Sequence, residues 1–418
     1  MRLRHVWCLV TAVLLCVGAF GGTAQAVDNK TDVIRGLGSD TTYGVMVALD
    51  ALFNNTPSDG VEGCYVVTQD TAATSQKDIS CNPATAGPPF SPENWDHDVA
   101  MSYYPVGSGN GKTQLQNQGN PGWARIDYAR SSSGRGSMSS DFRFVAFARD
   151  AVSWVSWGDA AGSPAAAVTN LTVSQLRGIF RDCTINNWSD VGGTSATIMK
   201  WAIQSGSGTR SFVDGSTQLS GNSANCVETG FGGAAAHTIF EHDPTPIRTC
   251  ETATPTPTCD TNGWKRSIWW MGFAAWTTSP IHPTFGKAMG SRLGSIEGVA
   301  PTAETIGKLP GEAGAFTWAR YVFNVYKNVA PNAITPAALD YVGPTGWICK
   351  GTAGTPDNVV AGTDSDDRGG HIVNRFTGKN WAQLITETMT AQGMARIAYG
   401  PLNREGVAVS GNARCIVF

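Results

Sequence analysis

Apolar and polar positions follow the same order three times along this chain: an apolar run, a turn rich in Gly and Ser, and a helical pattern. In the first unit, residues 32–36 have the composition of a strand, and residues 45–53 carry apolar side chains at helical spacing. Ser39 or Asp40, in the turn between them, is expected to cap the helix.

The other two units are built in the same way. Residues 101–107 and 200–203 are strand-like, and the Gly/Ser turns after them lead into the helical stretches 112–115 and 210–213. Three strand–turn–helix units predict an α/β fold whose polar turns gather at the carboxyl ends of strands.

Three more apolar runs are typical of strands. Residues 143–149 and 151–155 form two β-like runs on either side of Asp150, and residues 316–326 form an aromatic one.

Two further helices have their own start signals. Thr172 and Gln175 have the spacing of a capping box before the helical residues 176–180. Asn380 is expected to cap a last helix over residues 381–394.

Residues 1–26 have the organisation of a secretory signal peptide. Arg2 and Arg4 precede an apolar core over residues 6–20, and Ala-Gln-Ala at 24–26 fits a cleavage site. No later run is long and apolar enough to span a bilayer. We therefore expect an exported protein, secreted, periplasmic or held at the cell surface.

Cysteine usage agrees with export. Of ten cysteines, two lie within the signal segment, and the remaining eight are an even number without any C-x-x-C spacing, which favours disulfides over a metal site. Spacing does not fix the connectivity, so other pairings stay open. The expected pairs join neighbours: Cys64 with Cys81, Cys183 with Cys226, Cys250 with Cys259, and Cys349 with Cys415.

Composition excludes some classes of partner. The 418 residues include 41% hydrophobic and 15% charged residues, and the formal net charge is -3. This is a globular composition with no positive field to attract nucleic acid or an anionic membrane. At this length we expect two or three domains.

The Gly/Ser turns suit a small oxyanion. A helix N-terminus presents unpaired N–H groups, glycine lets the backbone approach, and hydroxyls add adjustable donors. One such turn is more often a simple cap, whereas three predict a shared site. Val106 and Ser205 stand where a P-loop and a nucleophile elbow require Gly, and His237 and Glu241 do not form an H-E-x-x-H motif. We expect no cofactor and no metal.

Four stretches resemble the phosphate-type periplasmic substrate-binding proteins of ABC importers, a PstS-like family. They are the first turn at residues 36–41, the second at 104–114, the segment at 176–190 and the third turn at 205–210. The resemblance implies the type 2 periplasmic-binding-protein fold: two α/β lobes, each a central sheet flanked by helices, with the ligand in the cleft between them.

The resemblance also implies where the chain passes between the lobes. The crossover strands would lie near residues 144–155 and 316–326. Lobe 1 would then comprise residues 27–148 and 327–418, and lobe 2 residues 149–326.

The family's ligand-binding positions map onto the three turns and a nearby Arg/Ser stretch, with hydroxyls and the amides of Gly208 and Thr209 as donors. The residues implied are Ser39, Asp40, Thr41, Ser108, Arg130, Ser131, Ser132, Ser207, Gly208, Thr209 and Arg210.

Two positions depart from the family pattern. Ile203 stands where the family has an arginine, and Ser132 where it has the aspartate that accepts the phosphate proton. The positive charge would then come from another arginine and the proton acceptor would be Asp40. The candidate arginines are Arg130, Arg135 and Arg210.

The expected function is therefore capture of a small oxyanion, phosphate above all, by an exported, non-enzymatic monomer that serves an ABC permease. Two other classes stay open. One is a secreted phosphoesterase-like enzyme, and the other is a surface protein of the same fold that has lost phosphate binding.

Overall fold

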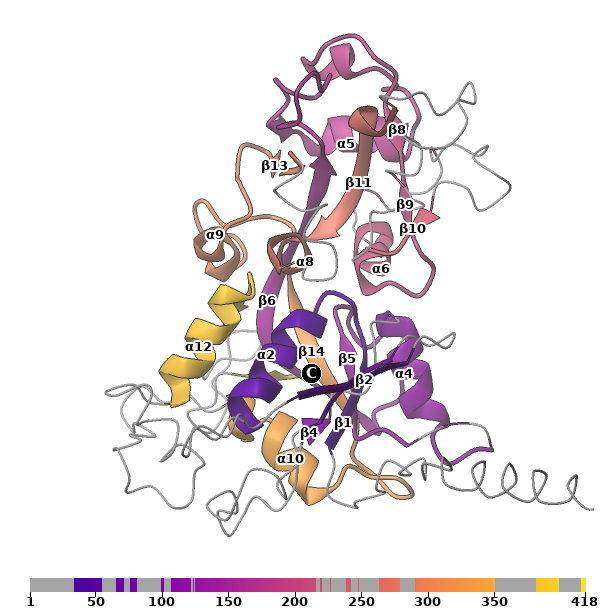
Figure 1. Ribbon diagram of the computed structural model, residues 1–418, viewed down its shortest axis with the longest axis vertical. Helices are drawn as coiled ribbons and strands as arrows, with labels where there is room; N and C mark the ends of the chain where they lie inside the picture. Colours follow the sequence, from indigo (N-terminus) through magenta and orange to yellow (C-terminus); the bar gives the residue numbers. More distant parts are fainter. Residues whose placement is uncertain are drawn as a thin grey trace, which may run out of the picture. The chain divides into compact units, whose positions relative to one another are not determined.

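A computed structural model of the chain places strands and helices over most of residues 107–215 and 263–349 and over shorter segments elsewhere (Figure 1). All of these belong to one compact unit, Ile34–Phe418. The described residues are 34–54, 65–70, 76–80, 99–100, 107–121, 123, 125–215, 219, 226, 238–241, 247, 263–278, 290–349, 381–397 and 415–418.

Several sequence predictions fall outside these residues. They include the signal peptide over residues 1–26, most of the predicted strand at 101–107, and the cap Asn380. The four cysteines of two predicted disulfides also lie there: Cys64, Cys81, Cys250 and Cys259.

Ten of the described strands build a mixed sheet, and the other six form three two-stranded sheets. On one side, β1 (Ile34–Gly38) pairs in parallel with β4 (Val99–Ala100) and with β5 (Tyr128–Ser131). β5 pairs antiparallel with β14 (Ala319–Lys327). The predicted α/β architecture, a central sheet flanked by helices, is confirmed, whereas the lobe boundaries stay a prediction.

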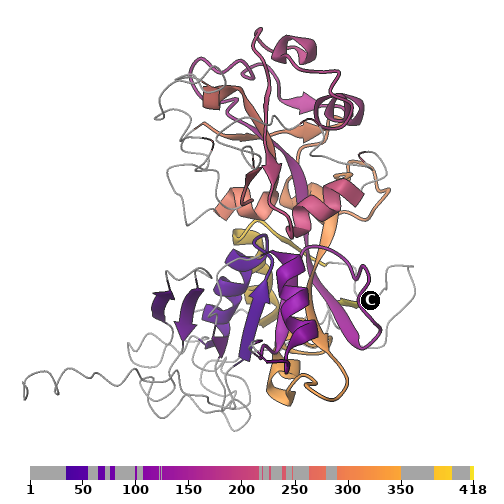
Figure 2. The ribbon, with the colours of Figure 1, turned by 90° about the vertical axis from the view of Figure 1, so that its right-hand side faces the viewer.

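The strand β6 (Phe142–Ser156) connects the two sides of the sheet. It runs beside β14 (Figure 1 and Figure 2) and then pairs antiparallel with β11 (Ser267–Gly272), which pairs in parallel with β8 (Met199–Lys200). Both predicted β-like runs are therefore strand, and they form one continuous strand. Asp150 interrupts the apolar pattern but not the strand, because its carboxylate accepts hydrogen bonds from Arg320 and from a backbone amide.

Alternate side chains of β6 enter different hydrophobic clusters, as the two-residue period of a strand requires. Phe144 and Ala146 belong to one cluster, and Val145 and Phe147 to another. All four are fully or almost fully buried, so the strand is covered on both faces.

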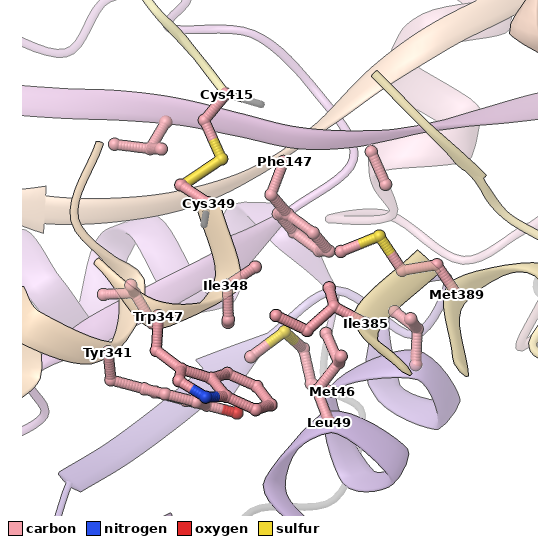
Figure 3. Close-up of a cluster of buried hydrophobic side chains, with 14 of the residues drawn as sticks. Met46, Leu49, Phe147, Tyr341, Trp347, Ile348, Cys349, Ile385, Met389 and Cys415 are labelled. Atoms are coloured by element: carbon pink, nitrogen blue, oxygen red, sulfur yellow. A yellow bond between two sulfur atoms is a disulfide. The ribbon is translucent and has the colours of Figure 1, made fainter. Parts of the chain in front are cut away.

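Helices provide that cover. The cluster of Val145 and Phe147, drawn in Figure 3, includes residues of α2 (Tyr43–Asn54), α10 (Pro336–Val342) and α12 (Trp381–Ala391). The other cluster receives side chains from α4 (Ser108–Asn117), which packs against β5 and β1.

The second half of the sheet repeats this scheme with larger side chains. Ile268 and Trp270 of β11 enter one cluster, and Trp269 and Met271 enter another.

The remaining elements are β2 (Tyr65–Asp70), β3 (Gln76–Ser80), β7 (Asn170–Leu171), α5 (Val173–Phe180), η2 (Trp188–Val191), β9 (Ala202–Ile203), α6 (Gly208–Gly215), β10 (Thr238–Ile239), η3 (Gly263–Arg266), α8 (Phe273–Thr278), β12 (Arg292–Leu293), β13 (Ser295–Ile296), α9 (Ala303–Gly307), η5 (Trp347–Cys349), β15 (Ala395–Arg396) and β16 (Ile416–Val417).

Two local predictions are confirmed in this part of the chain. Thr172 and Gln175 form the capping box of α5. The predicted disulfides Cys183–Cys226 and Cys349–Cys415 are present, and Figure 3 shows the second at the hydrophobic cluster beneath β6. Among the described helices, none has the length and hydrophobicity needed to cross a membrane.

One buried carboxyl group makes the stability of this core depend on pH. Asp50 of α2 accepts a hydrogen bond from the hydroxyl of Tyr341. Burial raises the pKa of Asp50 from 3.8 to about 8, outweighing the opposing effects of that hydrogen bond and of the charge of Arg130. Between these values the folded protein keeps a proton that the unfolded chain has released.

We therefore expect the free energy of unfolding to fall as pH rises from about 4 to about 8, by at most about 1.4 kcal/mol per pH unit from this group. In Asp50→Asn this part of the slope disappears, because the amide does not titrate. Urea denaturation across that range measures it, with Asp182→Asn, a partly exposed carboxylate, as the control. Equal slopes in the wild type and Asp50→Asn would contradict the assignment.

Candidate functional site

The first turn, after β1, directs its hydroxyls inward. Helix α2 begins at Tyr43, whose amide donates to the carbonyl of Asp40 at 3.1 Å, and capping by Ser39 or Asp40 stays a prediction. The side chain of Ser39 donates to the Oγ of Ser132 at 3.0 Å. Thr41 is buried beside them, with its Oγ1 3.4 Å from Ser132 Oγ.

The second turn brings Ser108 to the same place. Gly107 precedes α4 with a φ of 89, a conformation that favours glycine, and Ser108 is the first residue of the helix. Its Oγ accepts the amide of Ser132 at 2.9 Å and lies 3.2 Å from the Oγ of Ser132. Ser132, just beyond β5, thus joins the first and second turns.

The third turn supplies Ser207 and Thr209. The Oγ of Ser207 caps α6 by accepting the amides of Thr209 at 3.1 Å and Arg210 at 3.2 Å. The amide of Thr209, expected to face a ligand, is therefore directed to this cap. Gly208 approaches the other turns so closely that a Cβ there would lie 2.3 Å from the Oγ of both Ser108 and Ser132.

Direct hydrogen bonds connect the third turn to the other two, and the amide of Gly109 in the second turn donates to the carbonyl of Gly206 at 2.9 Å. Thr209 Oγ1 lies 3.2 Å from Thr41 Oγ1, and Gln204 Nε2 donates to Asp40 Oδ2 at 2.7 Å. We call the side-chain hydroxyls that meet here the hydroxyl cluster, and all of them are buried. They belong to Ser39, Thr41, Ser108, Ser132, Ser207 and Thr209.

Arg320 of β14 brings a positive charge to the hydroxyl cluster. Its Nη2 donates to Thr209 Oγ1 at 2.7 Å, to Thr41 Oγ1 at 3.0 Å and to Asp150 Oδ2 at 3.0 Å. The side chain is 3% exposed, and its Nε and Nη1 have no hydrogen-bond partner among the residues that the structure describes. Two guanidinium donors therefore remain available beside the hydroxyls.

The sequence did not single out Arg320, although a signal was present. Arg320 interrupts the aromatic run at 316–326, and Asp150 separates the two apolar runs of β6. The two residues are direct register partners of β14 and β6. Opposite charges inside two apolar strands are costly to bury unless they pair, which is a reason to expect their contact.

The arginines proposed from the sequence lie elsewhere. Arg130 is buried, but its Nη1 donates to the carbonyl of Gly36 at 3.2 Å and its guanidinium lies over the ring of Tyr43. Arg210 contacts Asp214 and donates to the carbonyl of Ile203. Arg130 also faces the carboxylate of Asp40 in the first turn, and the amide of Arg210 belongs to the helix cap at Ser207.

Arg135 and Ser131 are also directed away from the hydroxyl cluster. Arg135 donates to the carbonyls of Phe142 and Phe418, both at 2.8 Å. The Oγ of Ser131 donates to the carbonyl of Ser133 at 2.7 Å. Of these two neighbouring serines, Ser132 therefore contacts the hydroxyl cluster, whereas Ser131 bonds its own loop.

A carboxylate also lies at the hydroxyl cluster. Glu241, two residues after β10, accepts hydrogen bonds from Thr41 on Oε1 and from Ser207 on Oε2, the latter at 2.5 Å. Burial and the nearby charge of Asp40 raise the pKa of Glu241, against the opposing charge of Arg320. No sequence signal indicated this role, because an isolated acidic residue in a polar segment is ordinarily solvated.

Residues 71–292, more than half of the chain, match a protein-family model described as a PBP superfamily domain. No curated protein matches the chain significantly.

Solved structures that align with the chain come from several bacteria. An ABC-type phosphate transport receptor from Vibrio cholerae aligns with a TM-score of 0.40 at 16% identity, covering 71% of this chain and 88% of that chain. A putative phosphate ABC transporter substrate-binding protein from Clostridium perfringens gives 0.44 at 14%, covering 87% and 99%. PstS from Borrelia burgdorferi gives 0.36 at 17%, covering 74% and 93%.

The buried ion pair at the site predicts a large loss of stability when it is broken. Arg320→Gln leaves Asp150 buried without its cation, so we expect a loss of about 3–5 kcal/mol in the free energy of unfolding. Arg181→Gln removes the half-exposed pair with Asp182 and should cost less than about 1 kcal/mol. Urea denaturation of both variants measures the difference, and similar small losses would show that the buried pair is not structurally important.

Proposed function

The chain belongs to the PBP superfamily, and on that basis we propose that it is a solute-binding protein that captures a small oxyanion, with phosphate as the ligand. The resemblance seen in the sequence is confirmed at the level of the superfamily. The observation that carries the proposal is the convergence of three turns, distant in sequence, on one buried hydroxyl cluster beside Arg320.

The donors of this cluster have the chemistry that a tetrahedral oxyanion needs. Each hydroxyl has one rotatable proton to donate, and the guanidinium of Arg320 adds Nε and Nη1 with a fixed positive charge. Hydrogen bonds from such groups to an ionised oxygen contribute about 1.5–3 kcal/mol each. Arg320 takes the part that the family pattern assigns to an arginine at the position of Ile203.

Ligand entry requires the turns to separate. Thr41 Oγ1 and Thr209 Oγ1 are 3.2 Å apart, whereas two donors that share one oxyanion oxygen must each stand about 2.7–2.8 Å from it on different sides. The bond between Gln204 and Asp40 must also lengthen or break. Binding is therefore coupled to an opening between the third turn and the first two, followed by closure around the anion.

The setting of this activity follows from the leader and the cysteines. A chain with a signal-like segment over residues 1–26 and the disulfides Cys183–Cys226 and Cys349–Cys415 suits an oxidising, extracytoplasmic compartment. There the protein would act as a monomer that delivers its ligand to an ABC permease.

A binding role is favoured over catalysis at Ser207. Its contact with Glu241 resembles a nucleophile with its base, but its Oγ also accepts the amides of Thr209 and Arg210. Those bonds occupy the lone pairs that a nucleophile would use. Among the described residues, no group of three potential metal ligands is found.

A pair of neighbouring serines tests the binding proposal. Ser132→Ala removes a hydroxyl from the centre of the cluster, so phosphate affinity should fall about tenfold or more in isothermal titration calorimetry. Ser131→Ala is the matched control, because its Oγ serves Ser133, and it should bind within about twofold of the wild type.

Other outcomes point to the other classes. Equal affinities in the two serine variants would remove the hydroxyl cluster from the binding site. No response to phosphate, sulfate or organic phosphates would indicate a surface protein that has lost the ligand, and sustained hydrolysis of phosphoesters would indicate an enzyme.

A further inference from the structure

The position of Glu241 at the hydroxyl cluster raises a question that the binding proposal leaves open. This residue follows β10, which pairs in parallel with β9 at Ile239 and Ile203. Its backbone amide donates to Gln204 Oε1 at 3.2 Å. Strand pairing and this hydrogen bond hold the segment of Glu241 against the third turn.

Both carboxylate oxygens of Glu241 take donors that an oxyanion would need. Oε1 accepts from Thr41 of the first turn, and Oε2 accepts from Ser207 of the third. A hydroxyl has a single proton, so neither Thr41 nor Ser207 can donate to Glu241 and to a ligand at once. The carboxylate of Glu241 therefore occupies the same donors as an internal anion.

The charges around Glu241 come from three other elements. Asp40 of the first turn is a second carboxylate, and Arg320 of β14 is the facing cation. Arg320 is itself paired with Asp150 of β6. A second guanidinium, that of Arg130, faces Asp40. With all of these groups ionised, three carboxylates stand against two guanidinium groups, so an anionic ligand would enter against net negative charge.

We propose that Glu241 is an internal competitor of the ligand: the oxyanion displaces its carboxylate from Thr41 and Ser207, and one proton is taken up from solvent onto Glu241 in the same step. This inference rests on the proposed function. Protonation removes the repulsion and converts Glu241 into a hydrogen-bond donor that can face the bound oxyanion. The raised pKa of Glu241, caused by burial and by Asp40, is in the direction that this exchange requires.

The consequence is a particular pH dependence. Where Glu241 is ionised in the ligand-free protein, each unit of rising pH weakens binding by up to about tenfold, because a proton must be recruited. Where it is already protonated, this dependence vanishes. Glu241 thus sets the pH at which the protein holds or releases its ligand.

The experiment is calorimetric titration of the full chain with inorganic phosphate at about pH 6 and about pH 8, in two buffers with different ionisation enthalpies. The variants are Glu241→Gln and the control Glu304→Gln. The control loses the same charge at a site that is 81% exposed and paired with Lys308. Phosphate titrates identically in every measurement, so differences between the proteins belong to the substituted residue.

We expect Glu241→Gln to bind phosphate about tenfold or more tightly than the wild type at about pH 8, with a smaller ratio at about pH 6. Proton uptake on binding should be larger in the wild type than in Glu241→Gln, and Glu304→Gln should match the wild type. Binding by Glu241→Gln alone, with no detectable binding by the wild type, would also support the competitor.

The failures of the two proposals are distinguishable. If the wild type binds phosphate and Glu241→Gln binds equally or more weakly, the competitor is overturned while the binding function stands. If Glu304→Gln tightens binding as much, the effect is one of net charge, and the competitor is again overturned. If none of the proteins binds phosphate at either pH, both proposals fall. Thermal unfolding shows whether each variant is folded, and Glu241→Ala replaces Glu241→Gln if the latter does not fold.

Discussion

The buried ion pair between Asp150 and Arg320 is the constraint on which both the sheet and the site depend. Asp150 lies two residues before β6 begins to pair with β11, and Arg320 of β14 is its direct register partner. Both side chains are almost fully buried, so each charge needs the other to offset its loss of hydration. The pair thereby fixes the register of the two long strands at the point where the apolar pattern of β6 is broken.

The same guanidinium that satisfies Asp150 also organises the hydroxyl cluster. Its Nη2 contacts Thr41 from the first turn and Thr209 from the third. Gly208 permits this approach, since any side chain there would collide with Ser108 and Ser132. Strand register, helix capping and close glycine packing are therefore parts of one arrangement, and a change in any of them would move the donors of the site.

Charge balance gives this site a character of its own. Arg320 brings its guanidinium into direct contact with the hydroxyl cluster, whereas Asp40, Asp150 and Glu241 are carboxylates within or beside it. In such a buried site, the protonation of the carboxylates and the affinity for an anionic ligand depend on each other. Removing a proton adds a negative charge, and little water is present to screen it. The carboxylates of the site therefore matter for anion binding as much as its hydrogen-bond donors do.

The sequence by itself determined the features that depend on near neighbours along the chain. The first and third strand–turn–helix units and the capping box at Thr172 follow from local pattern. The disulfides Cys183–Cys226 and Cys349–Cys415 agree with the expected pairing of neighbouring cysteines, although spacing alone left other pairings open. The tertiary structure alone decided which charges meet the hydroxyl cluster. Arg320 and Glu241 lie 279 and 200 residues from Thr41, and no local propensity records contacts over such separations. It also decided between Ser131 and Ser132, because the direction of each side chain depends on what packs around the end of β5 rather than on the residue itself.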